Sequence, residues 1–377
     1  MLQTLIVKLT PTREQHNILL ETMHKFNEAC NYIIEIAFNL KSANKFKLQA
    51  IVYREVRQTF GLSAQLTIRA IAKVVEAYKR DKKVKPQFKP EGAVVYDQRI
   101  LSWKGLESVS LISLQGRLKI PVLMGTYQKK RLDRIRGQAD LIYRNNEFYL
   151  AVVVDVPEQS KFQEIDILGL DLGIINLAVD SDGQVFSGHN VEAVRKRLSG
   201  LRATLQSVGS KNAKRHLRKI SRYETRFCRD ANHCISKLIV AKAKDTVRAI
   251  ALEDLSGIRK SVTVRKAQRS RIHSWAFYQL RNFIEYKAII AGIPVYRVDP
   301  RYTSQTCPKC NHVEKTNRPS RDLFRCVSCG FSDHSDHVGA VNIRLRALVN
   351  KPIAVYSEVK AKIGTATEYN CKSVMDN

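Results

Sequence analysis

The sequence predicts a multidomain protein: an antiparallel β-barrel with a helical insertion in the amino-terminal half, and an α/β fold in the carboxy-terminal half. Three observations carry this prediction. Short alternating apolar runs separated by Gly, Asn and Pro follow a long helical region. Beyond about residue 160, strand patterns alternate with helix patterns. Four cysteines stand in two close pairs near the end, and 377 residues suffice for two or three cores.

The amino-terminal half combines one strand, two helical segments and a series of short strands. Residues 2–10 alternate as a strand does, and Thr10 with Pro11 predicts the cap and first turn of a long helix. A second helical segment covers about residues 47–82. Runs such as ESVSLISL, GRLKIPV, ADLIYR and FYLAVVVDV predict strands within 93–157 that close a small barrel with the first strand.

The carboxy-terminal half alternates strands and helices. IDILGLDLG predicts a buried strand, INLAVDSDGQVFSG a hairpin with an Asp-Gly turn, and residues 191–245 long basic helices. AIALEDLSG is a second strand, HSWAFYQLRNFIEYKAIIAG a helix ending at Gly292, and IPVYRVDP a third strand. A last helix is expected over about 337–349, and the weak periodicity of 350–377 predicts a tail without regular structure.

The charge balance points to a polyanionic partner. The chain has 64 Lys and Arg against 35 Asp and Glu, a net charge of +29, and nucleic acid is the usual polyanion that such an excess binds. An anionic membrane surface or a ribosomal-type structural role are the alternatives. No segment reaches the roughly 18 apolar residues that a membrane span needs, and the start, MLQTLIVKLTPT, lacks a signal-peptide cleavage pattern. We therefore expect an intracellular protein with reduced thiols.

Four of the eight cysteines are organised. Cys307, Cys310, Cys326 and Cys329 form two C-x2-C pairs fifteen residues apart, the spacing of a structural zinc ribbon with one tetrahedral Zn²⁺. Phe324 and Phe331 would supply its small core. A redox C-x2-C pair is the alternative, but it would not need the second pair. Cys30, Cys228, Cys234 and Cys371 are interpreted as buried or incidental thiols.

Three acidic residues stand where a structural protein rarely places them. Asp171 lies in the apolar run ILGLDLGI, Glu253 near the end of the apolar strand RAIALED, and Asp336 opens the last helix. A carboxylate in a core strand is costly unless it is paired or binds a metal. Three converging carboxylates would hold two Mg²⁺ ions about 3.5–4 Å apart, an arrangement that cleaves phosphodiesters.

Each acidic residue taken alone also fits a structural role. Asp171 suits a turn, Glu253 a cap or an arginine partner, and Asp336 an N-cap. GLDLG before a hairpin is also similar to the first phosphate loop of actin-like ATPases and sugar kinases. Those proteins carry a second Asp-x-Gly phosphate loop that this sequence lacks, and the net charge and the cysteine pairs favour a nuclease.

An ordered set of motifs resembles TnpB, the RuvC-type protein family of bacterial and archaeal insertion sequences. The motifs are GLDLGIINLAVDSDG, basic helices ending NHCISKLIVAKA, IALEDLSG, HSWAFYQLRNFIEYKA, VDPRYTSQTCPKC and FRCVSCGF. The resemblance covers about residues 165–345. The amino-terminal half matches only in layout: a first strand, inserted helices and a barrel.

The resemblance implies an RNA-guided DNA endonuclease, from a family regarded as the ancestor of type V CRISPR effectors. One RuvC site of RNase H-like fold cuts both strands of double-stranded DNA with Mg²⁺, and a transposon-end RNA (omega RNA) supplies the guide. Asp171, Glu253 and Asp336 match the RuvC acidic residues, and the four paired cysteines match the family's ribbon. The resemblance also implies a cytoplasmic, nucleoid-associated protein, with one protein per RNA or a dimer on DNA.

The family layout predicts five regions of this chain. They are a β-barrel (wedge) domain over 1–11 and 83–160, a helical recognition lobe over 12–82 that helps read a short motif beside the target, a RuvC domain over 161–302 and 331–349, a zinc ribbon that binds target nucleic acid over 303–330, and the tail over 350–377.

The stretch FSDHSDHVGAVNI departs from the family pattern, because Val338 replaces an asparagine and Gly339 an alanine. Since Asp336 and Asn342 keep their places, we expect the metal site to persist and Val338 to remove one polar group from the active-site helix. For the neighbours we expect Asp333 in a turn or cap, His334 in support of the site, and His337 facing solvent.

A basic stretch of helix is the predicted contact for nucleic-acid backbones, with a solvated helix face as the alternative. Its residues are Lys211, Lys214, Arg215, Arg218, Lys219, Arg222 and Arg226. Residues 264–275 are a candidate lid, and Trp275 and Tyr278 are expected in packing. The competing functions are a guide-loaded repressor, which would lack an acidic residue, a compact type V CRISPR effector, and a DNA-joining transposase without a guide.

Overall fold

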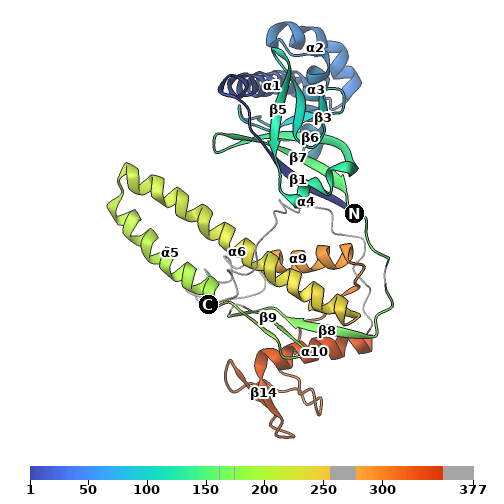
Figure 1. Cartoon of the computed structure of the whole chain (residues 1–377), viewed down its shortest axis with the longest axis vertical. Helices are drawn as coiled ribbons and strands as arrows, with labels where there is room; N and C mark the ends of the chain where they lie inside the picture. Colours follow the sequence, from blue (N-terminus) through green and yellow to red (C-terminus); the bar gives the residue numbers. More distant parts are fainter. Residues whose placement is uncertain (161, 174, 255–276, 351–377) are drawn as a thin grey trace. The chain divides into compact units, whose positions relative to one another are not determined.

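A computed structural model describes residues 1–160, 162–173, 175–254 and 277–350 (Figure 1). These form two compact units, the first ending at Val156 and the second beginning at Pro157. The candidate lid, Trp275, Cys371 and the tail beyond residue 350 lie outside the described residues. None of the described helices is long and apolar enough to cross a membrane.

The first unit is built on one seven-stranded antiparallel sheet, in the order β2–β6–β7–β1–β5–β4–β3. Tyr96 of β2 donates its hydroxyl to the carbonyl of Ile112 on β4 (2.9 Å), so the sheet curves back towards its own edge. The four runs predicted as strands form β4 to β7. The bounds are β1 Leu2–Leu9, β2 Val94–Tyr96, β3 Leu101–Lys104, β4 Ser108–Ser113, β5 Gly116–Leu123, β6 Ile135–Arg144 and β7 Glu147–Asp155.

Three helices share the core of this sheet, and the short α4 (Thr126–Lys129) and η1 (Leu132–Arg134) lie between β5 and β6. The first long helix is capped by Thr12, not by Thr10 as predicted. The Thr12 hydroxyl accepts the Gln15 amide and the Gln15 side chain accepts the Thr12 amide, a reciprocal capping box. Only Thr12 has a glutamine three residues later. The bounds are α1 Arg13–Asn39, α2 Lys45–Phe60 and α3 Ala64–Arg80.

The second unit contains a five-stranded sheet in the order β10–β9–β8–β11–β12. The strands β8, β11 and β12 are parallel, whereas β9 and β10 add an antiparallel edge. This confirms the predicted strands and the hairpin between β9 and β10. The bounds are β8 Asp166–Asp171, β9 Asn176–Asp180, β10 Val185–Ser187, β11 Arg248–Glu253 and β12 Val295–Val298.

Helices cover both faces of this sheet (Figure 1). Side chains of α6 and α9 pack on Leu168, Leu170 and Ile250 on one face, and α10 packs on Ile167 and Ala251 on the other. A small two-stranded sheet and a 3-10 turn precede α10. The bounds are α5 His189–Val208, α6 Lys211–Asp245, α9 Phe277–Ile290, η2 Lys315–Asn317, β13 Leu323–Arg325, β14 Ser332–His334 and α10 Ser335–Asn350.

Gly169 lets α10 lie directly on β8. A Cβ atom at this position would stand 2.1 Å from the carbonyl oxygen of Ala340 and 2.7 Å from the amide nitrogen of Arg344, both on the helix backbone. Backbone atoms cannot turn aside as a flexible side chain can. The close packing of this helix, which carries one of the candidate metal ligands, therefore depends on a missing side chain.

The Gly169→Ala variant should be destabilised by about 3 kcal/mol, because overpacking a rigid contact forces the helix away from the strand. Urea denaturation measures this change. The matched control is Gly200→Ala within α5, where a Cβ would meet no atom within 4 Å. That variant should gain up to about 1 kcal/mol from helix propensity. Equal stability of Gly169→Ala and the parent protein would contradict the packing argument.

Candidate metal-dependent active site

Strand alternation places two of the predicted acidic residues on the face that α10 covers. Side chains alternate along β8, so Asp171 points to the same face as Ile167 and Gly169, which both contact α10. On β11, Glu253 shares a face with Ala251 for the same reason. The two strands are parallel neighbours, with Leu252 in register with Leu170. Asp171 and Glu253 therefore lie at adjacent carboxyl ends of the sheet.

The third acidic residue comes from the start of α10. Asp336 is the second residue of this helix, and its carboxylate accepts a hydrogen bond from the Asn176 side chain on β9 (2.9 Å). Gly339, one turn later, faces Asp171: a Cβ there would be 2.9 Å from an Asp171 carboxylate oxygen. The structure thus brings together all three acidic residues that the sequence singled out, and Gly339 makes room for one of them.

The electrostatics of the cluster fit a cation. Burial, then repulsion from Glu253 and Asp336, raises the pKa of Asp171 to about 8, while Arg318 opposes the shift. Burial also raises the pKa of Glu253. Hard carboxylate oxygens that repel one another suit Mg²⁺, which would remove the repulsion.

Magnesium-free protein should lose stability as the pH rises from about 5 to 8. In this range the unfolded chain has released the Asp171 proton, whose ordinary pKa is 3.8, while the folded chain still holds it. The free energy of unfolding should therefore fall by about 1.4 kcal/mol per pH unit and level off once Asp171 ionises. Chemical denaturation in magnesium-free buffer measures the slope. Asp171→Asn should flatten it; an unchanged slope in that variant would assign the effect to other groups.

The loop between β12 and the first cysteine pair contacts the Glu253 carboxylate. The Thr303 hydroxyl donates a hydrogen bond to the Glu253 carboxylate. Asn342 of α10, a buried residue, donates to the carbonyls of Thr303 and Thr306, both at 2.7 Å. The motif YTSQTC contains both threonines, but its spacing alone gave no sign that one of them contacts a carboxylate.

Arg318 brings a positive charge to the cluster. Its guanidinium lies 3.8 Å from Asp336 and donates hydrogen bonds to the carbonyl of Arg321. The residue stands in the gap between the two cysteine pairs, far from Asp171 and Glu253 in sequence. Sequence reasoning missed it, because one arginine among 64 basic residues carries no signal.

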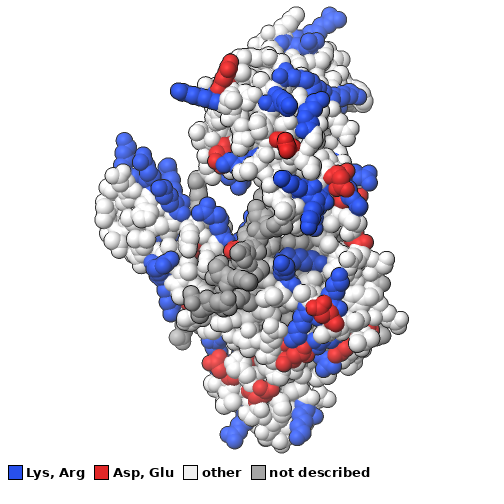
Figure 2. Space-filling view, in the orientation of Figure 1, with Lys and Arg blue, Asp and Glu red and all other residues white. Residues whose placement is uncertain are grey.

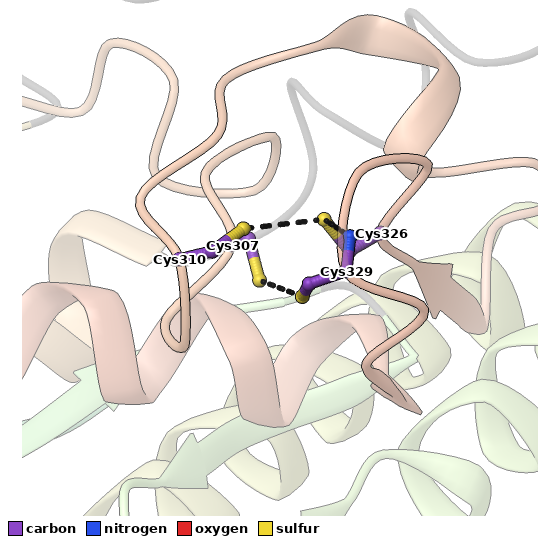
Figure 3. Close-up of side chains that lie close together, drawn as sticks. All are labelled: Cys307, Cys310, Cys326 and Cys329. Atoms are coloured by element: carbon purple, nitrogen blue, oxygen red, sulfur yellow. Dashed lines mark hydrogen bonds between the residues drawn. The ribbon is translucent and has the colours of Figure 1, made fainter.

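The four paired cysteines converge on one point (Figure 3). All four sulfur atoms lie within 4.8 Å of one another, with Cys307 to Cys329 and Cys310 to Cys326 both at 3.6 Å. A disulfide needs about 2.05 Å, whereas a tetrahedron with Zn–S bonds of about 2.3 Å has edges of about 3.8 Å. The geometry therefore fits one zinc ion. Among the other described cysteines, Cys30 and Cys234 are buried and Cys228 is half-buried.

The residues around Asp336 differ from expectation in three ways. Asp333 lies on β14, not in a turn, and its carboxylate contacts the His337 imidazole (2.7 Å). His337 also reaches the Ser181 carbonyl (3.4 Å), so it is half-buried and paired, not solvent-facing. Val338 packs against the cysteine core, with an exposed fraction of 1%. The departure that faces the acidic cluster is therefore Gly339, not Val338.

His334 lies beside the site. Among the described residues, its imidazole contacts none of the side-chain carboxylates of Asp171, Glu253 and Asp336. Its Nδ1 accepts the Asp336 backbone amide (3.2 Å), which supports the start of α10. Its Nε2 lies 3.9 Å from Asp322, and the side chain is exposed. The supporting role predicted for His334 is thus a helix-end contact in this structure.

The acidic residues of the hairpin DSDG are neutralised by cations. Asp180 pairs with Lys242 of α6 (2.5 Å), and Asp182 pairs with both Lys242 and Arg248 (2.9 and 2.6 Å). Hydrogen bonds from Arg248 and Lys242 lower the pKa of Asp182. This contrasts with Asp171, whose pKa is raised. The hairpin carboxylates therefore hold α6 and β11 together, and their charges are already paired.

The predicted basic contacts lie along α6, where Lys and Arg side chains gather on the α5–α6 hairpin (Figure 2). The exposed members are Lys211, Lys214, Arg215, Arg218, Lys219 and Arg226, and none has an ion-pair partner in the described part of the chain. The side chain of Arg222 lies outside the described residues. Arg195 and Arg202 instead pair with Glu224 and hold α5 to α6. Tyr278 is 63% exposed on α9, and the guanidinium of Arg281 lies over its ring at 5.7 Å, so it packs along the helix and not in the core.

Two family models match the chain. The model described as a probable transposase covers residues 151–258, and the Cas12f1-like TNB domain covers residues 277–343. Over these residues the chain is similar to a transposon-encoded transposase family and to Cas12f1-like proteins. The matched segments contain the acidic residues Asp171, Glu253 and Asp336 and all four paired cysteines.

Three curated relatives are similar to parts of this chain. A CRISPR-associated endodeoxyribonuclease Cas12f1 of Sulfoacidibacillus thermotolerans is 30% identical over 59% of this chain and 55% of its own. A putative RNA-guided DNA endonuclease, InsQ, of Escherichia coli is 32% identical over 47% of this chain and 48% of its own. A TnpB-like protein of Methanocaldococcus jannaschii is 27% identical over 60% of this chain and 85% of its own. The chain spans about half the length of the first two.

A solved structure shares the fold. The mini-RNA-guided endonuclease CRISPR-Cas_phi3 has a TM-score of 0.58 and 11% identity, covering 94% of this chain and 93% of that one. At this identity the likeness concerns the fold alone. It agrees with the multidomain α/β architecture and the curved antiparallel sheet described above.

Proposed function

We propose that this protein is a Mg²⁺-dependent, RNA-guided endonuclease that cuts double-stranded DNA beside a short motif. The observation that carries the proposal is the meeting of Asp171, Glu253 and Asp336 on the α10 face of a mixed sheet, next to a four-cysteine site. The strand order, with three parallel strands and an antiparallel edge, supports an RNase H-like (RuvC) domain. The family match and the +29 charge support a nucleic-acid substrate.

Asp171, Glu253 and Asp336 would hold two Mg²⁺ ions, which when bound activate a water molecule and stabilise the leaving oxygen. The protein's own part is to fix the ligands. Asn176 orients the Asp336 carboxylate and Thr303 orients that of Glu253. Fixed ligands need no rearrangement when the scissile phosphate arrives, which lowers the barrier.

Arg318 is proposed to face the scissile phosphate from the cysteine ribbon. Its guanidinium contacts Asp336 at 3.8 Å and also donates to a ribbon carbonyl, so it is held beside the site without a close carboxylate pair. A guanidinium here can donate to a phosphate oxygen as negative charge develops. This position makes the ribbon part of the cutting site as well as a structural element.

The remaining regions are assigned by the same proposal. Residues 1–11 and 83–160 form the wedge domain, 12–82 the recognition lobe, and 303–330 a ribbon that contacts target DNA. Zn²⁺ on the four cysteines is structural, because four thiolates leave no open coordination position. The exposed lysines and arginines of α6 contact the phosphates of the guide–target heteroduplex.

The proposal is tested by co-expressing the protein with the DNA that follows its gene. A discrete RNA should co-purify, and the complex should cut a plasmid carrying the matching target only with Mg²⁺. No discrete co-purifying RNA would reject the guided mechanism. Binding without cutting would instead identify a guide-loaded repressor, and an RNA that maps to a repeat–spacer array would identify a compact CRISPR effector.

A further inference from the structure

One residue beside the candidate site has a backbone conformation that its side chain disfavours. Tyr302 has φ of +61°, in the left-handed region where bulky residues are rare. Such strain persists only where the surroundings impose it, and it is concentrated at functional sites. Tyr302 immediately precedes Thr303, whose hydroxyl contacts the proposed metal ligand Glu253. The strained residue is therefore about one Cα–Cα step, roughly 3.8 Å, from the ligand's support.

Side chains of α10 hold the turn around Tyr302 through hydrogen bonds to its backbone carbonyls. Arg346 donates to the carbonyls of Asp299 (2.8 Å) and Arg301, and Asn342 donates to those of Thr303 and Thr306.

The Tyr302 carbonyl itself accepts the amides of Gln305 and Thr306, both at 3.0 Å. It also accepts the Thr306 hydroxyl at 2.7 Å. The conformation is thus imposed by the site's own scaffold.

No contact in the described part of the chain stabilises a tyrosine side chain at this position. The residue is 59% exposed, and among the described residues its ring makes no aromatic contact and its hydroxyl no hydrogen bond. Glycine would adopt the same φ without strain. The benefit of the ring therefore comes from outside the described residues, and we take its source to be a second molecule.

The neighbouring charge indicates the chemistry of that molecule. Arg301 is exposed and, within the described residues, has no carboxylate partner. An exposed aromatic ring beside an unpaired guanidinium suits an unpaired nucleotide, with the base on the ring and the phosphate on the cation. A base within a duplex is already stacked and would not need the ring.

We propose that Tyr302 stacks on an unpaired DNA base next to the scissile phosphate and positions that phosphate over Asp171, Glu253 and Asp336. This inference rests on the proposed endonuclease function. It adds a residue that binds the DNA strand next to the scissile phosphate. Tyr302 is a substrate-positioning residue, and its ring, not its hydroxyl, is the group that acts.

The test compares two substitutions at one position. Tyr302→Phe keeps the ring, so single-turnover cleavage of a guide-matched duplex should stay within about twofold of the parent rate. Tyr302→Gly removes the ring and relieves the strain, so cleavage should slow by about 10- to 100-fold without a lower melting temperature. The matched control is Val247→Gly: Val247 also has a positive φ (+50°) and is 40% exposed, but it precedes the opposite end of β11. Cleavage by this variant should be unchanged.

A second measurement detects base stacking on Tyr302, through quenching of 2-aminopurine fluorescence, without any DNA cleavage. Guide-loaded complex in magnesium-free buffer is mixed with target duplexes carrying 2-aminopurine at successive positions of each DNA strand. One position beside the cut should be quenched by the parent and by Tyr302→Phe, but not by Tyr302→Gly.

Equal cleavage or equal quenching in Tyr302→Gly would overturn the inference, as would quenching only of a 2-aminopurine placed in the guide RNA. Because quenching needs no cutting, failure of the nuclease function and failure of this inference are read separately.

Discussion

Replacing Asp171 by asparagine should lower the rate of DNA cleavage by about 1,000-fold or more while leaving guide and target binding intact. Asparagine keeps the size of the side chain, so the close contact with Gly339 is preserved. It removes the negative charge that would be shared between two Mg²⁺ ions, and each lost factor of ten in rate corresponds to about 1.4 kcal/mol of barrier. Single-turnover cleavage measures the rate, and a gel-shift titration measures binding.

Removing a negative charge elsewhere in the same unit separates this effect from a general loss of charge. The Asp322 side chain is 65% exposed in the ribbon, and among the described residues its carboxylate makes only long charge contacts, 3.8 Å to Arg321 and 3.9 Å to His334. Asp322→Asn should cut within about twofold of the parent rate. If Asp171→Asn cut as fast as Asp322→Asn, the metal site would lie elsewhere, whether or not the protein is a guided nuclease.

The second large effect concerns the cysteine site. Cys326→Ser should release the zinc ion and unfold the ribbon, because isolated zinc fingers draw about 10–16 kcal/mol of their folding free energy from the metal. The ribbon core consists of little more than Cys307, Phe324, Cys326 and Val338, with Phe331 packed against it. Without zinc this core is too small to stay folded. Metal analysis by mass spectrometry should find the loss of one zinc per chain.

Cleavage should fall with the zinc, because the ribbon is joined to the acidic cluster. Val338 packs into the ribbon core two residues after Asp336, and Arg318 reaches Asp336 from the ribbon. Cys228→Ser, a half-buried thiol outside the ribbon, is the control and should keep both zinc and activity. A Cys326→Ser protein that retains a full zinc ion would show that the site is not the one assigned.

Much of the fold was accessible from the sequence, because local patterns decide where elements begin and which residues share a face. The apolar runs ILGLDLGI and RAIALED predicted two buried strands, and β8 and β11 confirm them. The two C-x2-C pairs predicted a metal site, and the four sulfur atoms do converge. Where local signals compete, prediction failed: Thr10 and Thr12 are both possible caps, and Gln15 decides for Thr12.

The surroundings of the acidic cluster were beyond reach for a different reason. Asn176, Thr303 and Arg318 contact the acidic residues from three separate elements, and no local pattern marks such distant partners. The prediction for His337 failed in the same way. Its position in the first helical turn indicated exposure, but β14 and the Ser181 carbonyl lie against that side of the helix.

The sequence alone determined the kind of chemistry in FSDHSDHVGAVNI: a carboxylate beside a cysteine ribbon on a strongly basic chain. Only the tertiary structure decided which of those residues faces the ribbon and which faces the acidic cluster. Val338 turns to the ribbon and Gly339 to Asp171, because consecutive residues of a helix point about 100° apart. Which of the two directions meets the ribbon depends on how α10 packs on β8 at Gly169. That packing is set by backbone contacts between segments more than 150 residues apart, which no spacing within the stretch records.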